Sequence, residues 1–204
     1  MTEYYYSKNP QVHHRIRRWQ FNLLGNRLTF VSDNGVFSKS TVDYGSRVLI
    51  KYADVTDLPA GDVLDLGCGY GPIGIALAKK YPTRHYVLTD VNNLALSLAQ
   101  KNATVNHLSN VTVFSSDRYE NINQKFAGIV TNPPIRAGKK VVMSILKGAA
   151  DYLVPNGSLT AVVRRKQGEP SAKRAMTKTY GNCRIVKRDK GYYVLKSVLR
   201  DESN

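Results

Sequence analysis

The chain has 204 residues, of which 42% are hydrophobic, and it carries a formal net charge of +15 at pH 7. This length suits one α/β domain and leaves no room for a second full domain. We therefore expect residues 1–204 to form a single domain, with an N-terminal β extension over 1–42 and a core over 43–204.

Two classes of protein are disfavoured by the composition. No apolar run reaches membrane-spanning length and the first residues lack a signal sequence, so we expect a cytoplasmic protein that is not membrane-bound. The two cysteines are too few for a disulfide framework and lack metal-ligand spacing, so we expect no metal site.

The N-terminal part alternates apolar and polar residues on both sides of a turn. Residues 19–24 and 28–31 flank Gly25 and Asn26, a pair typical of tight turns. This pattern predicts a β hairpin within residues 15–40, followed by a helix that Asp43 caps.

From residue 63 onward, apolar runs alternate with helical patterns, which predicts a doubly wound α/β sheet. We expect strands at 63–68, 86–90, 111–116, 126–131 and 157–164, and helices near 72–81, 93–105, 139–153 and 171–180. Pro72 suits the first helical turn, and the Pro-Asn-Gly run at 155–157 should stop a helix before the fifth strand. Runs on either side of residues 189–191 suggest a C-terminal antiparallel hairpin that completes a mostly parallel, Rossmann-like sheet of seven strands.

The most informative motif is Asp65-Leu-Gly-Cys-Gly-Tyr-Gly71, which follows the apolar Val63 and Leu64. Its three glycines, Gly67, Gly69 and Gly71, allow a tight turn and let a nucleotide-like cofactor lie against the backbone. Asp65, at the end of the strand, is placed to hold a cationic or hydroxyl-rich ligand group. The glycines fit both S-adenosylmethionine and NAD, and a Gly-rich turn without any ligand is a further alternative.

Two acids end the next two predicted strands. Asp90 follows the glycines by about 20 residues, the spacing expected of a carboxylate that binds two ribose hydroxyls. Asp117 is placed to accept a hydrogen bond from an adenine amino group. The alternatives are that Asp90 caps the following helix and that Asp117 is a solvated turn residue.

Asn132-Pro-Pro-Ile135, which follows the apolar run 126–131, favours methyl transfer over hydride transfer. Successive prolines lack N–H donors and leave carbonyl oxygens free to face a ligand. The Asn132 side-chain oxygen and the Pro133 carbonyl can accept both hydrogens of a conjugated amine and aim its lone pair at a methyl sulfonium. Both hydrogen bonds strengthen as positive charge develops on the nitrogen.

We therefore predict that Asn132, Pro133, Pro134 and Ile135 form a catalytic motif beside the cofactor, with Asn132 bordering both sites. Ile135 would pack against a base that has been flipped out of its stack. On this hypothesis Asn132→Ala lowers kcat, whereas Asn132→Asp is milder because a carboxylate can still accept from the amine. The alternative is an ordinary turn that ends a strand.

With these motifs the chain resembles class I S-adenosylmethionine-dependent methyltransferases, in particular a single-domain form of the RsmC-type guanine-N2 methyltransferases of small-subunit ribosomal RNA. Five further segments contribute to the resemblance, at 35–38, 43–46, 165–168, 170–172 and 190–192. The resemblance implies S-adenosyl-L-methionine as cofactor, the N2 amine of an RNA guanine as acceptor, and a place for Phe37 and Ser38 in the cofactor or base pocket. The chain departs from the pattern at Ile135, where many amine methyltransferases have an aromatic residue, and longer RsmC-type enzymes carry a second, degenerate domain.

Positive charge is distributed unevenly along the chain. Residues 62–117 contain four basic and four acidic side chains, whereas 164–204 contain twelve basic and four acidic. We expect RNA as the partner, since such a surface suits a polyphosphate backbone, and a monomer is assumed. A generic solvated basic surface is the alternative. The predicted phosphate contacts are Arg164, Arg165, Lys166, Arg17 and Arg18.

Three rival functions remain open at the level of the sequence. The first is the same chemistry on DNA adenine or on a protein glutamine. The second is a non-catalytic RNA-binding module, and the third is an NAD-linked oxidoreductase, for which no proton-transfer residue is evident.

Overall fold

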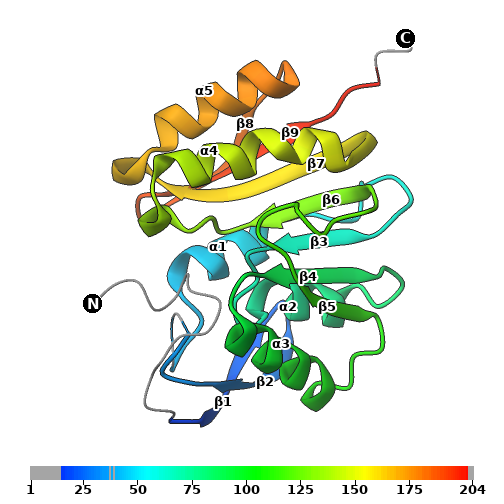
Figure 1. Ribbon diagram of the computed structural model, residues 1–204, viewed down its shortest axis with the longest axis vertical. Helices are drawn as coiled ribbons and strands as arrows, with labels where there is room; N and C mark the ends of the chain where they lie inside the picture. Colours follow the sequence, from blue (N-terminus) through cyan, green and yellow to red (C-terminus); the bar gives the residue numbers. More distant parts are fainter. Residues whose placement is uncertain (1–14, 37, 39, 202–204) are drawn as a thin grey trace.

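The computed structural model describes residues 15–36, 38 and 40–201 (Figure 1). These residues form a seven-stranded sheet in the order β5-β4-β3-β6-β7-β9-β8, together with a separate two-stranded sheet, β1-β2. The elements are β1 (Arg17–Leu23), β2 (Asn26–Ser32), α1 (Tyr44–Tyr52), β3 (Val63–Leu66), α2 (Pro72–Lys80), β4 (Tyr86–Asp90), α3 (Asn93–Val105), β5 (Val111–Ser115), β6 (Phe126–Thr131), η1 (Ile135–Ala137), α4 (Lys139–Gly148), η2 (Ala149–Tyr152), β7 (Leu153–Arg164), η3 (Arg165–Gln167), α5 (Glu169–Tyr180), β8 (Arg184–Asp189) and β9 (Tyr192–Val198).

The predicted α/β fold is confirmed. The strands from β5 to β7 pair in parallel, and β9 pairs antiparallel with both β7 and β8, as the predicted C-terminal hairpin requires. Pro72 stands at the start of α2, and the predicted N-terminal hairpin is the β1-β2 pair. No helix in the described ranges is long and apolar enough to cross a membrane.

The largest differences from the predicted boundaries lie between α4 and β7. The helix expected over 139–153 ends at Gly148, and β7 begins at Leu153 instead of residue 157. The Pro-Asn-Gly run lies within β7 as an irregularity, because Phe126 pairs with Leu153 whereas Gly128 pairs with Ser158. A Cβ on Gly157 would lie 2.8 Å from the Val154 carbonyl oxygen, so only glycine permits this close backbone approach.

Helices cover both faces of the large sheet, and side chains alternate between two apolar cores. Val63 packs with α1, α2 and α3 on one face, whereas Leu64 and Leu66 pack with α4 and α5 on the other (Figure 1). This alternation follows from the two-residue period of a strand. The burial of both faces accounts for the near-continuous apolar runs that mark the parallel strands in the sequence.

Two asparagines, Asn102 on α3 and Asn106 at the C-cap of this helix, dock the N-terminal hairpin onto the core. The Asn102 amide accepts from the Val31 N–H at 2.6 Å and donates to the Val31 carbonyl at 3.0 Å. One turn later, the Asn106 amide makes the same pair of bonds to the N–H and carbonyl of Thr29, at 3.0 and 2.7 Å. The side chains thus satisfy the edge of β2 as a neighbouring strand would.

Candidate active site

A cavity of about 490 Å³ lies at the carboxyl ends of the parallel strands. It is lined by the loop after β3, the end of β4, the segments after β5 and β6, the end of β7, and two residues at the start of α1. The sheet order reverses here, since β3 pairs with β4 on one side and β6 on the other. Ligands of open α/β sheets bind at such a switch point.

The glycine loop after β3 presents bare backbone to the cavity. Gly67 and Gly69 line it with φ of +74° and +58°, and a Cβ built on either would meet nothing within 4 Å. The Gly67 and Cys68 N–H groups donate to the Thr89 carbonyl at 2.8 and 2.9 Å, which ties the loop to β4. The loop is therefore a fixed, open cradle of the kind that a nucleotide cofactor needs.

Gly71 and Asp65 lie behind this loop and are not among the residues that line the cavity. Gly71 has a φ of +92°, and a Cβ built on it would lie 2.9 Å from the Ile75 side chain. Both the turn and the close packing against α2 therefore require glycine at this position. The buried Asp65 accepts from the Gly74 N–H at 2.8 Å and holds the first turn of α2. A cofactor contact for either residue stays a prediction.

Asp90 lines the cavity, and its carboxylate is held by backbone donors. It accepts from the Gly69 N–H at 2.8 Å and from the Asn92 N–H at 3.0 Å. Burial raises the pKa of Asp90, and these N–H donors oppose that shift. The N-cap of α3 is Asn92, whose side chain accepts from the Ala95 N–H, so Asp90 does not serve as the cap.

Asp117 also lines the cavity, but its carboxylate already has a cationic partner. The Arg118 Nε lies 2.9 Å from Asp117 Oδ1, and the side chains of Arg118 and Asp117 are 39% and 50% exposed respectively. An adenine amino group would share this carboxylate with Arg118. The role predicted for Asp117 stays a prediction.

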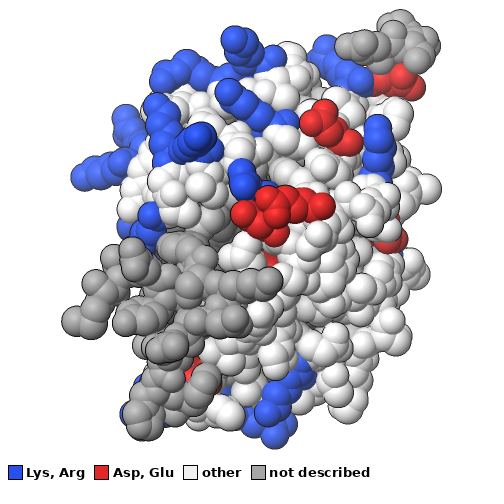
Figure 2. Space-filling model, in the orientation of Figure 1, with Lys and Arg blue, Asp and Glu red and all other residues white. Residues whose placement is uncertain are grey.

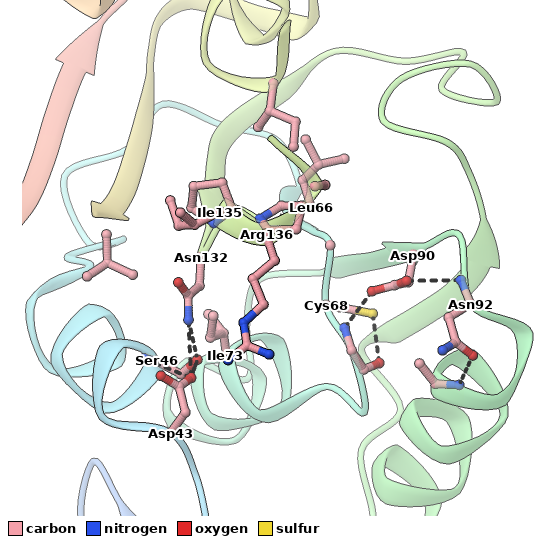
Figure 3. Close-up of a pocket in the computed structure, with 18 of the residues that line it drawn as sticks. Asp43, Ser46, Leu66, Cys68, Ile73, Asp90, Asn92, Asn132, Ile135 and Arg136 are labelled. Atoms are coloured by element: carbon pink, nitrogen blue, oxygen red, sulfur yellow. Dashed lines mark hydrogen bonds between the residues drawn. The ribbon is translucent and has the colours of Figure 1, made fainter. Parts of the chain in front are cut away.

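The Asn132-Pro-Pro-Ile135 segment leaves β6 and enters the cavity (Figure 3). The Pro134 and Ile135 carbonyls accept from the N–H groups of Ala137 and Gly138, which closes the short helix η1. The Pro133 carbonyl accepts no backbone hydrogen bond from the described part of the chain. Ile135 is partly buried against the core under α4 and also lines the cavity.

The Asn132 amide is held by two residues at the start of α1. Its Nδ2 lies 3.1 Å from Asp43 Oδ2 and 3.1 Å from Ser46 Oγ (Figure 3). Because a carboxylate accepts hydrogen bonds and does not donate them, the NH₂ group must face Asp43. The Asn132 oxygen is therefore turned away from this pair, and all three residues line the cavity.

Sequence reasoning assigned Asp43 to the helix cap alone and did not identify Ser46 as a site residue. Asp43 does cap α1, since it accepts from the N–H groups of Gly45 and Ser46. The signal available was the 43–46 segment, but nothing in its spacing connects it to Asn132, 89 residues away. Arg136, an exposed cation that lines the cavity, was also missed (Figure 3).

Of the residues predicted from resemblance, Ser38 lines the cavity and has φ +58°, while Phe37 lies outside the described residues. The basic residues fall into two groups. Arg164 lines the cavity with its guanidinium 4.8 Å from the centre of the Tyr192 ring. Arg165 and Lys166 follow it in η3, whereas Arg17 and Arg18 lie in β1, at the other end of the molecule (Figure 1).

The chain is similar to known methyltransferases. The family described as methyltransferase small domain matches residues 27–196. The chain is 44% identical over 199 residues to the protein YbxB of Bacillus subtilis, a match that covers 97% of this chain and 98% of YbxB. It is 40% identical over 151 residues to the ribosomal RNA small subunit methyltransferase C of Aeromonas hydrophila, over 71% of this chain and 42% of that protein.

A solved structure gives the same fold. RsmC of T. thermophilus, a 16S rRNA N2 methyltransferase in complex with AdoMet and guanosine, superposes with a TM-score of 0.83 at 26% identity, over 94% of this chain and 52% of that one. The chain thus spans about half the length of the RsmC proteins it matches. The chain belongs to the methyltransferase small domain family, as an S-adenosylmethionine-dependent methyltransferase of the RsmC type.

Proposed function

We propose that this protein transfers a methyl group from S-adenosylmethionine to the exocyclic N2 amine of a guanine in small-subunit ribosomal RNA. The observation that carries the proposal is the orientation of Asn132, whose NH₂ group is taken up by Asp43 and Ser46, so that its oxygen remains an acceptor. The Pro133 carbonyl offers a second acceptor in the same cavity. Relatives named ribosomal RNA small subunit methyltransferase C support the RNA substrate.

The cavity suits the cofactor at its glycine-loop end. The open backbone at Gly67 and Gly69 would accommodate the cofactor, and Asp90 would bind the ribose hydroxyls with its remaining lone pairs. Asp117 would accept from the adenine amine, and Ser38 would border the bound group. When bound, S-adenosylmethionine supplies a methyl group on a positively charged sulfur.

The acceptor end would act by orientation and electrostatics. The N2 nitrogen of guanine is a poor nucleophile because its lone pair is conjugated with the ring. Two fixed acceptors, the Asn132 oxygen and the Pro133 carbonyl, would bind both amine hydrogens and turn the lone pair toward the methyl group. Positive charge on the nitrogen strengthens both bonds during transfer. The product loses its proton readily, so no strong base is needed, and Ile135 would pack against the flipped base.

RNA would bind over the basic surface next to the cavity. Arg164 at its rim, followed by Arg165 and Lys166, is placed to contact phosphates close to the modified nucleotide. Arg17 and Arg18 would contact a more distant part of the RNA. In this proposal residues 43–204 are the catalytic core of one methyltransferase domain, residues 1–42 extend it, and the reaction takes place in the cytoplasm.

Mapping methylated guanines in ribosomal RNA from cells with and without the protein tests this function. We expect one N2-methylguanosine to disappear with the protein, and the purified chain with labelled S-adenosylmethionine to restore it on that RNA. The Asp90→Ala variant, which lacks the predicted ribose acceptor, should not restore it at limiting cofactor. Label in DNA adenine or protein glutamine, or RNA binding without any transfer, would contradict the proposal.

A further inference from the structure

We propose that Asp43 and Ser46 are positioning residues, which lock the amide of Asn132 with its oxygen toward the acceptor amine. This inference rests on the proposed methylation of an amine. In this proposal the start of α1 orients Asn132 and does not itself contact the acceptor amine or the methyl group.

The three side chains form a short directed network. Ser46 Oγ donates to Asp43 Oδ2 and accepts from Asn132 Nδ2, while Asp43 Oδ2 accepts from Asn132 Nδ2 directly. Ser46 is 4% exposed. Ser46 Oγ and Asp43 Oδ2 are hydrogen-bonded to each other and lie on the same side of Nδ2, whereas the two N–H bonds of an amide diverge by about 120°, so the two oxygens share one hydrogen. This shared hydrogen bond fixes the NH₂ group on the side of Asp43, and the amide oxygen is left as an acceptor on the other side.

Without this network the amide would have two orientations of similar energy. Rotation by half a turn about the last side-chain bond exchanges the oxygen and the NH₂ group, and both orientations fit the same space. In the wrong orientation Asn132 would present donors to an amine that itself must donate. Hydrogen bonds to a carboxylate also polarise the amide, which makes its oxygen a better acceptor as positive charge develops on the amine.

The network reverses the expectation that Asn132→Asp is a mild change. A carboxylate oxygen would replace Nδ2 at about 3.1 Å from Asp43 Oδ2. Two ionised carboxylates at that distance repel each other, and such a pair binds a shared proton with a raised pKa. At neutral and alkaline pH we therefore expect the carboxylate introduced at position 132 to turn away from Asp43. Its oxygens are then no longer held in the direction of the acceptor amine.

Capping of α1 does not account for the contact with Asn132. The cap consists of the bonds from Gly45 and Ser46 N–H to Asp43, and an asparagine at position 43 caps a helix about as well as an aspartate. With its oxygen in the place of Oδ1, the Asp43→Asn variant keeps the capping bond from the Gly45 N–H, and its NH₂ group, in the place of Oδ2, presents a donor to Asn132. The Asn132 amide should then turn around and offer its NH₂ group to the substrate.

A double-mutant cycle tests whether Asp43 positions Asn132. The measurement is single-turnover methyl transfer at saturating S-adenosylmethionine, and the substrate is small-subunit ribosomal RNA from cells that lack the protein. We expect Asn132→Asp and Asp43→Asn each to slow transfer by about 10- to 100-fold at pH 8, the range for a lost charge-assisted hydrogen bond. The double variant Asp43→Asn/Asn132→Asp should be at least about 10-fold faster than Asn132→Asp, because the new amide can donate to the new carboxylate.

The pH profile gives a second signature. The rate of Asn132→Asp relative to wild type should rise as pH falls, since the shared proton restores a donor toward Asp43 and leaves one oxygen for the amine. The double variant should show no such rise. Cofactor affinity, measured by calorimetry, should be similar in all four proteins because none of the changes alters the glycine loop.

Lys51→Gly is the matched control for helix stability, since it weakens the exposed last turn of α1 without touching Asn132. We expect it to transfer methyl groups at the wild-type rate. If wild type labels no guanine, the proposed function fails. If wild type is active but the double variant is no faster than Asn132→Asp, or Lys51→Gly is as slow as Asp43→Asn, the positioning role is overturned.

Discussion

Asp65 carries a fully buried carboxyl group with a single hydrogen bond. One oxygen accepts from the Gly74 N–H at 2.8 Å, and the other has no partner in the described part of the chain. Burial raises the pKa of Asp65 to about 7, the Gly74 N–H opposes this, and the charge of the nearby Asp90 adds to it. A single hydrogen bond does not offset the cost of burying a charged carboxylate, so the carboxyl group takes up a proton near neutral pH.

The protein should therefore lose stability as pH rises. The pKa of Asp65 is higher in the folded state than in the unfolded chain, so the folded state binds more protons between the two values. Protonation of Asp65 therefore adds to the free energy of unfolding. The full contribution is present below about pH 4 and is lost as pH rises through about 7, at roughly 1.4 kcal/mol per pH unit. The Asp65→Asn variant keeps an acceptor for the Gly74 N–H but cannot ionise, so its free energy of unfolding should depend less on pH.

Urea unfolding of wild type and Asp65→Asn between pH 4.5 and 8 measures this effect. Glu120→Gln, at an exposed carboxyl group, is the control and should follow the wild-type curve. Asp90, whose pKa burial also raises, is present in all three proteins. Parallel curves for wild type and Asp65→Asn would show that Asp65 ionises normally.

Among the elements, α3 has two tasks, because it covers the sheet and also holds the N-terminal hairpin. The Asn102 side chain bonds to the N–H and carbonyl of Val31 in β2, and donates to the Tyr70 carbonyl in the glycine loop at 2.9 Å. One buried amide thus joins the hairpin, α3 and the cofactor cradle. The hairpin ends a few residues before Ser38, which lines the cavity.

Asn102→Leu should weaken both the fold and the cofactor site. It leaves the Val31 and Tyr70 backbone groups buried without partners, at about 1–3 kcal/mol for each unsatisfied group. We expect a lower free energy of unfolding in urea and weaker binding of S-adenosylmethionine in calorimetry. Gln100→Leu, on the exposed side of the same helix, should change neither. Unchanged cofactor affinity in Asn102→Leu would show that the loop holds its shape without this bond.

The whole molecule has an uneven distribution of charge. Lys and Arg gather over the upper part of one face, where α4 and α5 lie (Figures 1 and 2). Exposed basic residues of these two helices are Lys139, Lys140, Lys147, Arg174 and Lys178. Arg164 connects this region to the cavity, since it lines the cavity at the end of β7. A polyanion bound over the helices would therefore reach the cavity at this point.

Changing Arg164, Arg165 and Lys166 to Gln should make RNA binding less dependent on salt. Each phosphate contact contributes about 0.7–0.9 to the slope of log affinity against log salt concentration, so the loss of three should lower the slope by about 2–3. A matched variant loses three exposed lysines outside this region, Lys80, Lys101 and Lys125. Its slope should change much less. Equal changes in the two variants would indicate a general effect of net charge instead of a binding surface.

The sequence by itself determined the fold class, the order of the main helices and strands, and several of the residues that line the cavity. Strand and helix periodicities depend on local side-chain patterns, and the buried parallel strands gave the strongest of these patterns. Gly67, Gly69, Asp90 and Asn132 lie at or directly after the ends of strands. Because the carboxyl ends of parallel strands share one edge of a sheet, their meeting at the cavity could be predicted.

Only the tertiary structure decided which atoms of these residues are free to act. Asp90 lines the cavity while Asn92 caps α3, and Asp65 turns to Gly74 behind the loop. Asn132 owes its orientation to Asp43, which lies 89 residues earlier in the chain. Hydrogen-bond partners so distant in sequence become neighbours only when folding brings the start of α1 beside the segment that follows β6. No local pattern encodes that choice, because a side chain's direction is set by the donors and acceptors that folding brings to it.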